Sequence, residues 1–382
     1  MIMNYKRLLF IDPQSYSNLA MYDYNLLDNL SVHEVVFLGN TKYDYKTIDD
    51  KIRFIPVFSY SDKKYKFIKL LSYCKSLFRI FFYCLKFRAN IIHLQWTRVL
   101  FVDYVFYTII SFVLNIPIVF TAHNVLPHNY KGKNIELYRK FYSLFKQIIV
   151  HTKSSKSEII RLFGEEFRDK VNVIPHGILK YDFPQRELDR RIKVLKNKYD
   201  LDDKIIFSSL GFQSPYKGTD IILKAWGSLS DELKKKSKLL IVGKNKGISF
   251  TSIEGDQSVV IENRFIDNAE FQSFLCISDV VLLPYRNISQ SGLLLSAIGE
   301  KKPVIVSNVG GLAEALDIAS IGWIMKEISS DELKSLFTEL IKNPINIRNV
   351  DIDQDSWKKI LDFYDWKHIA NKTLVVYNKV KH

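Results

Sequence analysis

The sequence predicts an α/β protein of two domains, each built on a parallel β-sheet with helices on both faces. The chain has 382 residues, enough for two domains that each bury a core. Short β-branched or apolar runs alternate with segments of helical periodicity in both halves, which is typical of doubly wound sheets. Ligands of such sheets bind at the carboxyl ends of the strands, so residues that directly follow a predicted strand are the first candidates for a site.

The first half contains a series of predicted strands, with helical patterns between several of them. A loop over 12–18 follows the first strand, and a helix is predicted over 22–30. The predicted strands are 8–11, 33–38, 52–57, 90–95, 116–121, 148–151 and 171–174.

A polar, charged stretch over 181–204 marks the predicted junction between the domains. We therefore expect an N-terminal domain over 1–182, a second domain over 183–363 and a terminal helical segment over 364–382. The predicted strands of the second domain are 205–210, 239–242, 259–261, 280–283, 304–306 and 323–325. Helices are predicted over 219–229, 268–277, 292–299, 331–342 and 366–379.

Two stretches of the first half resemble membrane-active segments. Residues 99–116 are almost entirely apolar, but Asp103 and Asn115 interrupt them, which favours a buried helix over a membrane span. Residues 63–88 carry eight Lys or Arg, no acid and many aromatic residues. This mixture favours a segment at an anionic bilayer surface, while a core helix with extended lysines is the alternative.

The net charge of +14 is concentrated in the first half of the chain. Residues 1–182 hold 26 basic and 15 acidic residues, which points to an anionic partner for that half. Nucleic acid is the least favoured such partner, because no recognition motif accompanies the charge. The three cysteines form no metal or disulfide pattern, and the apolar run at 8–11 is too short for a signal-peptide core. These observations predict a cytoplasmic protein.

The octapeptide 211–218, GFQSPYKG, lies between a predicted strand and a predicted helix. A glycine at the strand end lets backbone N–H groups approach an anion, and the helix N-terminus adds partial positive charge. Lys217 would act there as a point charge for a phosphate. An ordinary turn with an exposed lysine is the alternative from these residues alone.

A second turn of this kind is Ser289-Gln290-Ser291-Gly292, which follows the strand at 280–283 and opens a helix. Hydroxyls, an amide and a glycine at a helix start form an anion nest, although either serine could act only as an N-cap. Two such turns in one domain favour a diphosphate ligand.

His123 follows the predicted strand 116–121, where a histidine can donate a hydrogen bond to a sugar hydroxyl or a developing charge. A structural role is the alternative, and it is the interpretation we give His176; His151 is a weaker candidate. The acidic stretch 351–355 precedes a helix, where acids favour the helix dipole, so we interpret it as capping rather than as a metal site.

The chain resembles the bacterial family-4 glycosyltransferases, which are retaining enzymes of GT-B architecture, in the branch with a QSG turn. The resemblance extends over nearly the whole chain, and the order of its motifs carries it. The motifs are TAHNVLPH (121–128), VIPHG (173–177), GFQSPYKG (211–218), LLPY and SQSG (282–292), KPVIVSNVGGLAE (302–314) and WKHIANKTLVVYNKV (366–380).

The resemblance implies two Rossmann-like domains that face a central cleft, with the final helix crossing back to the first domain. It implies transfer of a sugar from a nucleotide-sugar, with retention of configuration and without a metal or other cofactor. His123 and Lys217 would be catalytic, and Asn18 and Asn124 would lie on the acceptor side. The implied donor-binding residues are Gly211, Ser214, Lys217, Ile266, Gln290, Ser291, Gly292 and Glu314.

Two departures from the family pattern affect donor recognition. The usual arginine of the glycine turn is replaced by Phe212 or Ser214, and the paired glutamates fall on Ile288 and Ser296. The two missing glutamates make an inactive scaffold of the same fold one alternative. Among enzymes, a phosphorylase or a sugar-nucleotide epimerase of this fold is the other. Our leading hypothesis is an enzyme of surface polysaccharide synthesis, bound peripherally to the inner face of the plasma membrane, with a lipid-linked acceptor.

Overall fold

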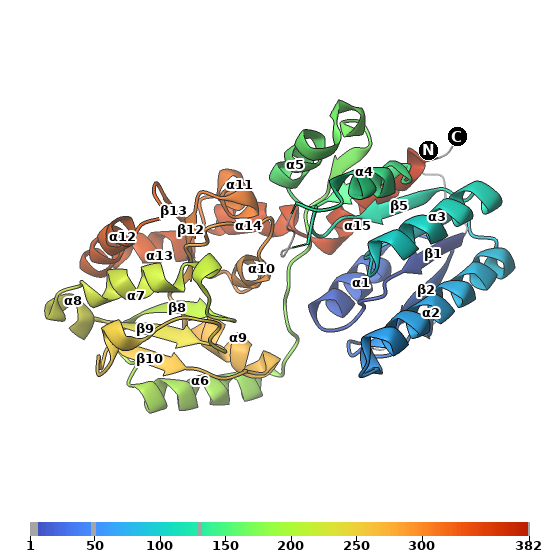
Figure 1. Ribbon diagram of the computed structural model, residues 1–382. Helices are drawn as coiled ribbons and strands as arrows, with labels where there is room; N and C mark the ends of the chain where they lie inside the picture. The colour runs from blue at the N-terminus through green and yellow to red at the C-terminus, as the bar shows by residue number, and fades with distance from the viewer. Residues whose placement is uncertain (1–6, 47–50, 128–131, 381–382) are drawn as a thin grey trace. The chain divides into compact units, whose positions relative to one another are not determined.

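The computed structural model describes residues 7–46, 51–127 and 132–380, and the chain divides into two compact units (Figure 1). Unit 1 comprises Met1–Gly177 together with Tyr364–His382, and unit 2 comprises Ile178–Phe363. The division therefore falls after Gly177 rather than after residue 182. Much of the predicted junction is helical and belongs to unit 2, since α6 spans Gln185–Tyr199.

The sheet of unit 1 is fully parallel, in the order β3-β2-β1-β4-β5-β6-β7. Strands that are buried on both faces read as continuous apolar runs, and for this reason the sequence predicted all of them. The strands are β1 (Arg7–Ile11), β2 (Glu34–Asn40), β3 (Ile52–Phe58), β4 (Ile91–Leu94), β5 (Ile118–Thr121), β6 (Gln147–Val150) and β7 (Val171–Val173). The strand order reverses between β1 and β4, so a crevice is expected at their carboxyl ends.

Helices cover both faces of this sheet. On one face, α1 (Asn18–Asn29) packs beside α15 (Trp366–Asn378), and Leu26, Ile369 and Tyr377 are buried there with β1. The opposite face packs against α2 (Lys66–Phe87), α3 (Leu100–Leu114) and α4 (Ile135–Ser143), with α5 (Lys153–Phe163) beside α4. The final helix thus belongs to unit 1 although it follows unit 2 in sequence.

The helix predicted over 99–116 forms as α3, but the prediction that it is buried is wrong. Only Asp103, Tyr107 and Ile110 are fully buried along its length. The carboxylate of Asp103, which interrupts the apolar run, accepts hydrogen bonds from the Tyr73 hydroxyl at 2.6 Å and from two backbone amides at 2.8 Å. The rest of the helix exposes apolar side chains. Among the described residues, no helix is long and apolar enough to cross a membrane.

Unit 2 has a second parallel sheet, in the order β10-β9-β8-β11-β12-β13. Its strands are β8 (Ile205–Leu210), β9 (Ser237–Val242), β10 (Val259–Glu262), β11 (Val280–Leu283), β12 (Val304–Ser307) and β13 (Gly322–Met325). Its order reverses between β8 and β11. The helices are α6, α7 (Thr219–Gly227), α8 (Asp231–Lys235), α9 (Asn268–Ile277), α10 (Gly292–Gly299), α11 (Gly310–Ile318), α12 (Ser330–Lys342), α13 (Ile345–Ile352) and α14 (Gln354–Phe363).

The two faces of this second sheet are covered by different helices. Helix α6 packs on α9, which packs against β8, and α7 packs against α12 over a core that contains Trp226 and Phe337. Before α14, the Asp353 carboxylate accepts a hydrogen bond from the Ser356 amide at 3.1 Å. This contact is the capping predicted for the acidic stretch.

Two buried carboxyl groups, Asp12 and Asp23, lie together where β1 ends and α1 passes over it. Both are fully buried, and a charge on Asp12 opposes ionisation of Asp23, so burial favours a proton on the pair. Burial raises the pKa of Asp12 to about 7, and burial together with the Asp12 charge raises the pKa of Asp23 well above its usual range. The pair therefore holds a proton through acidic pH.

This pair makes the protein less stable as the pH rises. The pKa of Asp12 is higher in the folded protein than in the unfolded chain, so protonation of this group favours the folded state. Its contribution to the free energy of unfolding is complete below about pH 4 and is lost as the pH rises through about 7. We expect Asp23→Asn to raise the free energy of unfolding at pH 8 by about 2 kcal/mol relative to wild type, and much less at pH 5. Urea denaturation at both pH values measures this, with the exposed Asp28→Asn on the same helix as the control. Equal changes at both pH values would contradict it.

Candidate functional site

The predicted glycine turn lies at the carboxyl end of β8, at the reversal point of the unit 2 sheet. Gly211 has φ +90°, a conformation that favours glycine, and a Cβ there would lie 3.2 Å from the Nζ atom of Lys217. The turn therefore brings the ammonium group of Lys217 over the backbone of Gly211. From there the ammonium group can contact an anion that rests on the turn.

Lys217 is half-buried and lies near a second cation that the sequence analysis missed. Burial, and secondarily the charge of Lys246, lower the pKa of Lys217 to about 8. The Lys246 amide donates a 2.7 Å hydrogen bond to the carbonyl of Gln213, and its Nζ atom lies 3.6 Å from the centroid of the Phe212 ring. Lys217 is therefore not the only cation at the turn. The signal for Lys246 was its place after β9, which ends at the same edge of the sheet as β8.

The depressed pKa of Lys217 predicts a pH dependence for anion binding at this turn. A diphosphate favours the charged lysine, so affinity should be full below the pKa of about 8 and fall as the pH rises through it. We expect binding of a nucleoside diphosphate, measured by calorimetry, to weaken about tenfold between pH 7 and pH 9. A Lys217→Arg variant, which stays charged, should show a flat profile. The same slope in both proteins would contradict the assignment.

Direct contacts join the glycine turn to the segment that follows β11. A Cβ on Gly218, which has φ +73°, would lie 2.1 Å from the carbonyl oxygen of Pro284, so only glycine allows this approach. Arg286 donates two hydrogen bonds to the Asp220 carboxylate, at 2.7 and 2.8 Å, and its backbone amide donates to the Tyr216 carbonyl. Its guanidinium also donates to the carbonyl of Pro215. The two predicted turns thus form one assembly.

The second turn leads into α10 as the sequence predicted. The Ser291 hydroxyl accepts a hydrogen bond from the Leu294 amide at 3.3 Å, so it acts as the N-cap of α10. It also forms a hydrogen bond with the buried phenol of Tyr285. Gln290 is half-buried and Gly292, the first residue of α10, is exposed. The orphan amides at this N-terminus are groups that can bind an anion.

A third loop, after β12, closes against the second turn. The Gly311 amide donates to the Ser289 carbonyl at 3.2 Å, and a Cβ on Gly310 would lie 1.9 Å from the Ile288 carbonyl oxygen. Glu314 lies on the helix that begins here, α11, and is half-buried. The loops after β8, β11 and β12 therefore converge on one end of the sheet.

Two of the predicted donor-binding residues have side chains that face the protein interior. The hydroxyl of Ser214 is buried and has no hydrogen-bond partner among the described residues, and the side chain of Ile266 is also buried. A ligand at this surface can therefore contact these two positions only through their backbone unless the loops move.

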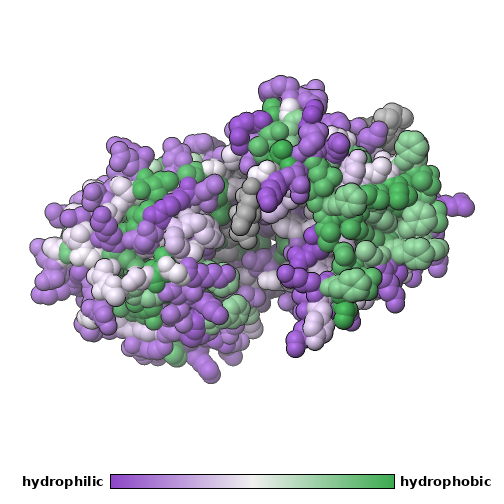
Figure 2. All heavy atoms as spheres, in the orientation of Figure 1, coloured by the Kyte–Doolittle hydropathy of each residue, from purple (hydrophilic) through white to green (hydrophobic). Residues whose placement is uncertain are grey.

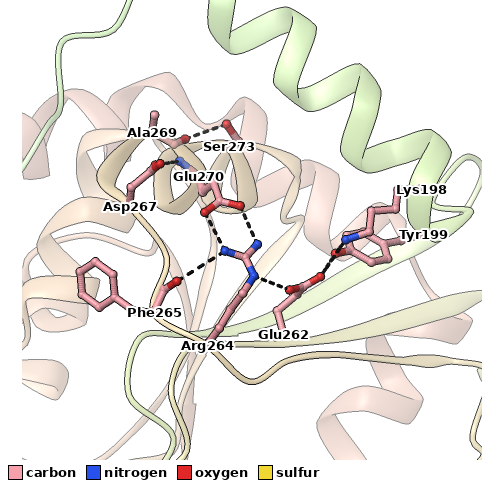
Figure 3. Close-up of polar contacts among 9 residues, drawn as sticks. All are labelled: Lys198, Tyr199, Glu262, Arg264, Phe265, Asp267, Ala269, Glu270 and Ser273. Carbon is pink, nitrogen blue, oxygen red and sulfur yellow. Dashed lines mark hydrogen bonds and ion pairs between the residues drawn. The ribbon is translucent and has the colours of Figure 1, made fainter.

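The loop after β10 is held by a network of charged residues (Figure 3). Arg264 pairs with Glu262 at 2.8 Å and with Glu270 at 2.6 Å, and Asp267 caps α9 by accepting from the Glu270 amide. The ring of Phe265 points away from this network and is 76% exposed. The loop thus presents an aromatic ring from a fixed backbone.

In unit 1, four histidines from neighbouring strands form a cluster at the carboxyl edge of the sheet. His93 lies on β4, and His123, His151 and His176 follow β5, β6 and β7. The rings of the last three lie around Tyr22, and the ring centroids of His123 and His176 are each 4.8 Å from that of Tyr22. His93 joins them through the side chain of Gln95, whose Nε2 lies 3.0 Å from the Nε2 atom of His93. Parallel neighbouring strands bring their ends together, which the linear sequence does not display. The cluster joins His123 to His151, which the sequence marked as a weaker site candidate, and to His176, which we interpreted as structural.

Both ring nitrogens of His123 have partners in this cluster. Nδ1 lies 3.2 Å from Nε2 of His151, and Nε2 lies 3.1 Å from the side-chain amide oxygen of Gln95. Because Nδ1 of His151 faces the carbonyl oxygen of Ile174 at 3.0 Å, it carries the proton, and its Nε2 accepts from His123. A neutral His123 then needs the amide group of Gln95 rotated so that its NH₂ faces Nε2.

The clustered histidines are neutral at physiological pH. Burial lowers the pKa of His93 to about 3 and of His151 to about 4, and it lowers the pKa of His123 well below its usual range. His176 behaves in the same way, with a pKa of about 3. His123 can therefore act as a neutral hydrogen-bonding group, but a ligand must displace Gln95 to reach Nε2.

A cavity of about 430 Å³ lies beside His123 in unit 1. Its walls include Trp96, Arg98, His123, Asn124, Tyr138 and Tyr142. Trp96 stands 5.4 Å from His123 between ring centroids. Asn124 lines this cavity, whereas Asn18, the other residue predicted for the acceptor side, is exposed at the start of α1 and does not line it. His128, quoted with this motif, lies outside the described residues.

Family models match both units of the chain. The model described as Glycosyltransferase Family 4 matches residues 31–178, and the model described as Glycosyl transferases group 1 matches residues 191–356. The chain belongs to the family-4 glycosyltransferases. The two parallel-sheet, Rossmann-like units are therefore those of a family-4 glycosyltransferase with the GT-B fold.

Relatives of this family-4 glycosyltransferase are distant in sequence. The glycosyltransferase MJ1607 of Methanocaldococcus jannaschii is 25% identical over 60% of this chain and 59% of its own length. The lipopolysaccharide glucosyltransferase WaaG of Escherichia coli is 24% identical over 43% of this chain and 44% of its own length. The matched region thus spans about half the length of these relatives.

Solved structures share the fold over nearly the whole chain. HepE of Anabaena, determined in complex with UDP, has a TM-score of 0.70 and 13% identity, covering 98% of this chain and 99% of that one. Sucrose-phosphate synthase of Thermosynechococcus elongatus has a TM-score of 0.73 and 15% identity, covering 98% of each chain. At this identity the likeness concerns the fold alone.

Proposed function

We propose that this family-4 glycosyltransferase moves a hexose-type sugar, with retention of configuration, from a nucleotide-sugar to a glycan acceptor in bacterial surface polysaccharide synthesis. The observation that carries the proposal is the assembly of two turns in unit 2. Lys217 and the amide-rich N-terminus of α10 follow adjacent strands, and Gly218 and Arg286 join the two turns. A diphosphate has the charge and the length to engage both. HepE, which shares the fold, was crystallised with UDP and with UDP-glucose.

In this proposal each part of unit 2 has a role toward the donor. Lys217 and the backbone amide of Gly292 at the start of α10 hold the diphosphate, with Gln290 beside it. The exposed ring of Phe265 stacks on the nucleobase, since its loop is fixed by Arg264. Glu314 is half-buried on α11, the helix that follows the loop in contact with the second turn, and it would take the place of one of the missing family glutamates toward the sugar or ribose.

The difficult step is the departure of the nucleoside diphosphate from a cationic sugar carbon. The bond between the anomeric carbon and the phosphate oxygen breaks, and negative charge grows on the leaving phosphate. Lys217 and the helix N-terminus stabilise this charge more than that of the bound donor. The acceptor hydroxyl attacks from the same face and passes its proton to the departing phosphate oxygen, so configuration is retained. These groups supply the positive charge, so we expect transfer to proceed without a metal ion or other cofactor.

The acceptor in this proposal is a lipid-linked glycan that enters the cavity of unit 1. Trp96 offers a flat apolar face to a sugar ring, and Asn124 offers hydrogen bonds to its hydroxyls. His123 can bond a hydroxyl through Nε2 once the sugar displaces Gln95. Arg98, which is exposed at the edge of the cavity, suits a phosphate of the lipid link. This acceptor would place the enzyme at the cytoplasmic face of the plasma membrane.

Turnover with candidate donors tests the proposal. The protein is incubated with UDP-, GDP- or dTDP-sugars and a membrane extract that supplies lipid-linked acceptors, and the product is analysed by NMR. We expect release of a nucleoside diphosphate only when acceptor is present, and an anomeric coupling constant that matches the donor. Inverted configuration would overturn the retaining mechanism. Product formed without acceptor would instead favour an epimerase, and incorporation of labelled phosphate would favour a phosphorylase.

A further inference from the structure

Helices α2 and α3 lie side by side on unit 1 and expose an unusual number of apolar side chains. Figure 2 shows a hydrophobic area over α3 and the adjoining part of α2, in the right half of the view. The exposed apolar residues of these helices are Phe67, Ile68, Leu70, Leu71, Phe78, Phe82 and Leu85 on α2, and Phe101, Val105, Ile109, Phe112 and Val113 on α3. Contiguous exposed apolar surface of this kind marks an interaction site.

The exposed apolar residues of α3 share one face of the helix. They follow one another at spacings of four, four, three and one, which is the helical repeat, and they include Phe101 at 64% and Phe112 at 89% exposure. The opposite face is fixed in the core by Asp103, Tyr107 and Ile110. The helix therefore exposes an apolar face along its whole length, on the side away from the core, and no charged side chain interrupts that face.

On α2 an apolar stripe is bordered by cations. Phe67, Leu71, Phe78, Phe82 and Leu85 recur at spacings of four, seven, four and three, so they line one side of the helix. Three exposed cations follow the same helical repeat along one border of this stripe. They are Lys75, Arg79 and Lys86. These three cations of 63–88 thus lie directly beside the apolar stripe.

The exposed charges on α2 and α3 themselves have one sign, because the one acid of these two helices, Asp103, is buried. No acidic residue occurs between Asp62 and Asp103, whereas nine Lys or Arg occur in that interval. A second copy of the same surface would repel this one, and a purely apolar protein partner would leave the cations without counterions. A surface that combines apolar groups with negative charge fits both features, and an anionic lipid bilayer is such a surface.

We propose that α2 and α3 together form a docking surface for an anionic bilayer. The exposed side chains of α3 enter the boundary between headgroups and acyl chains, and Lys75, Arg79 and Lys86 of α2 contact lipid phosphates. Residues 96–98, which line the cavity of unit 1, lead directly into α3. A lipid-linked acceptor would then lie close to that cavity, a point that rests on the proposed function; the docking itself does not.

Cosedimentation with vesicles tests the docking without any sugar substrate. At low ionic strength we expect the full-length protein to bind vesicles made of equal parts phosphatidylglycerol and phosphatidylcholine, and to bind pure phosphatidylcholine far less. Phe101→Ser with Phe112→Ser should weaken the partition coefficient at least about tenfold, because both rings lose their burial in lipid. Lys75→Glu with Arg79→Glu and Lys86→Glu should weaken it about 100-fold.

Matched variants on unit 2 serve as controls. Ile345→Ser with Ile352→Ser removes exposed apolar residues, and Lys342→Glu with Lys358→Glu and Lys359→Glu reverses three exposed cations. Both control proteins should bind as wild type does. The proposal is overturned if wild type stays in the supernatant, if the double Phe variant binds undiminished, or if the controls lose binding equally. It is also overturned if ultracentrifugation shows that α3 is covered by a second copy, with Phe112→Ser abolishing that dimer.

Discussion

Replacing Lys217 by alanine is expected to lower kcat/KM for sugar transfer by about 100- to 1,000-fold, the cost of removing one group that stabilises a developing oxyanion. Lys217 lies over the glycine turn, partly shielded from water, where its charge acts strongly on a leaving phosphate. Initial rates with the donor found by turnover measure the effect. Most of the loss should appear in kcat, because the charge on the phosphate grows during departure.

Two further variants serve as controls, one that keeps a positive charge at position 217 and one that removes a lysine elsewhere on unit 2. Lys217→Arg keeps the charge and should retain a larger part of the activity than Lys217→Ala, and Lys224→Ala removes an exposed lysine from α7 and should leave activity unchanged. A Lys217→Ala enzyme with kcat/KM within a factor of about three of wild type would exclude the assigned role.

Replacing Gly218 by alanine is expected to destabilise the fold of unit 2 and to abolish donor binding. The residue has φ +73°, and the new Cβ would lie 2.1 Å from the Pro284 carbonyl oxygen, so the two turns must separate. Backbone strain and steric overlap together should lower the free energy of unfolding by about 3 kcal/mol. Urea denaturation measures this cost, and calorimetry with the nucleoside diphosphate measures the loss of binding.

Gly255 provides the control for Gly218. It has φ +79°, but no atom lies within 4 Å of the position of its Cβ. Gly255→Ala should therefore cost only about 1 kcal/mol, from backbone conformation alone, and should leave binding intact. Equal losses in the two variants would show that the contact between Gly218 and Pro284 does not hold the turns together.

The strands and the class of fold could be predicted because strands buried on both faces leave continuous apolar runs. The positions of β8 (Ile205–Leu210) and β11 (Val280–Leu283) were predicted to the residue. Helix α6 was missed because it is rich in Lys and Arg and buries only Leu188 fully. This polar character masked the helical spacing of Leu188, Ile192, Leu195 and Tyr199. The burial of α3 was predicted wrongly because apolar composition alone does not reveal whether an apolar helix face is buried in the core or exposed.

The candidate site was predictable where one segment carries it and unpredictable where the fold assembles it. Lys217 and the turn at 289–292 follow strands, and this local pattern was enough to identify them. Lys246 and the ion pair of Arg286 with Asp220 arise from segments far apart in sequence. Likewise, the pairing of His123 with Gln95 and His151 depends on strand order, which a linear pattern does not contain.

Calorimetric titration with nucleoside diphosphates tests most directly whether unit 2 binds the diphosphate of a sugar donor. UDP, GDP and dTDP are each titrated into wild type, Lys217→Ala and Lys224→Ala, with the corresponding monophosphates as controls. The account predicts that at least one diphosphate binds wild type and Lys224→Ala equally, that its monophosphate binds less tightly, and that Lys217→Ala binds the diphosphate about 10- to 100-fold more weakly. Absence of diphosphate binding, or binding that Lys217→Ala leaves unchanged, would contradict it.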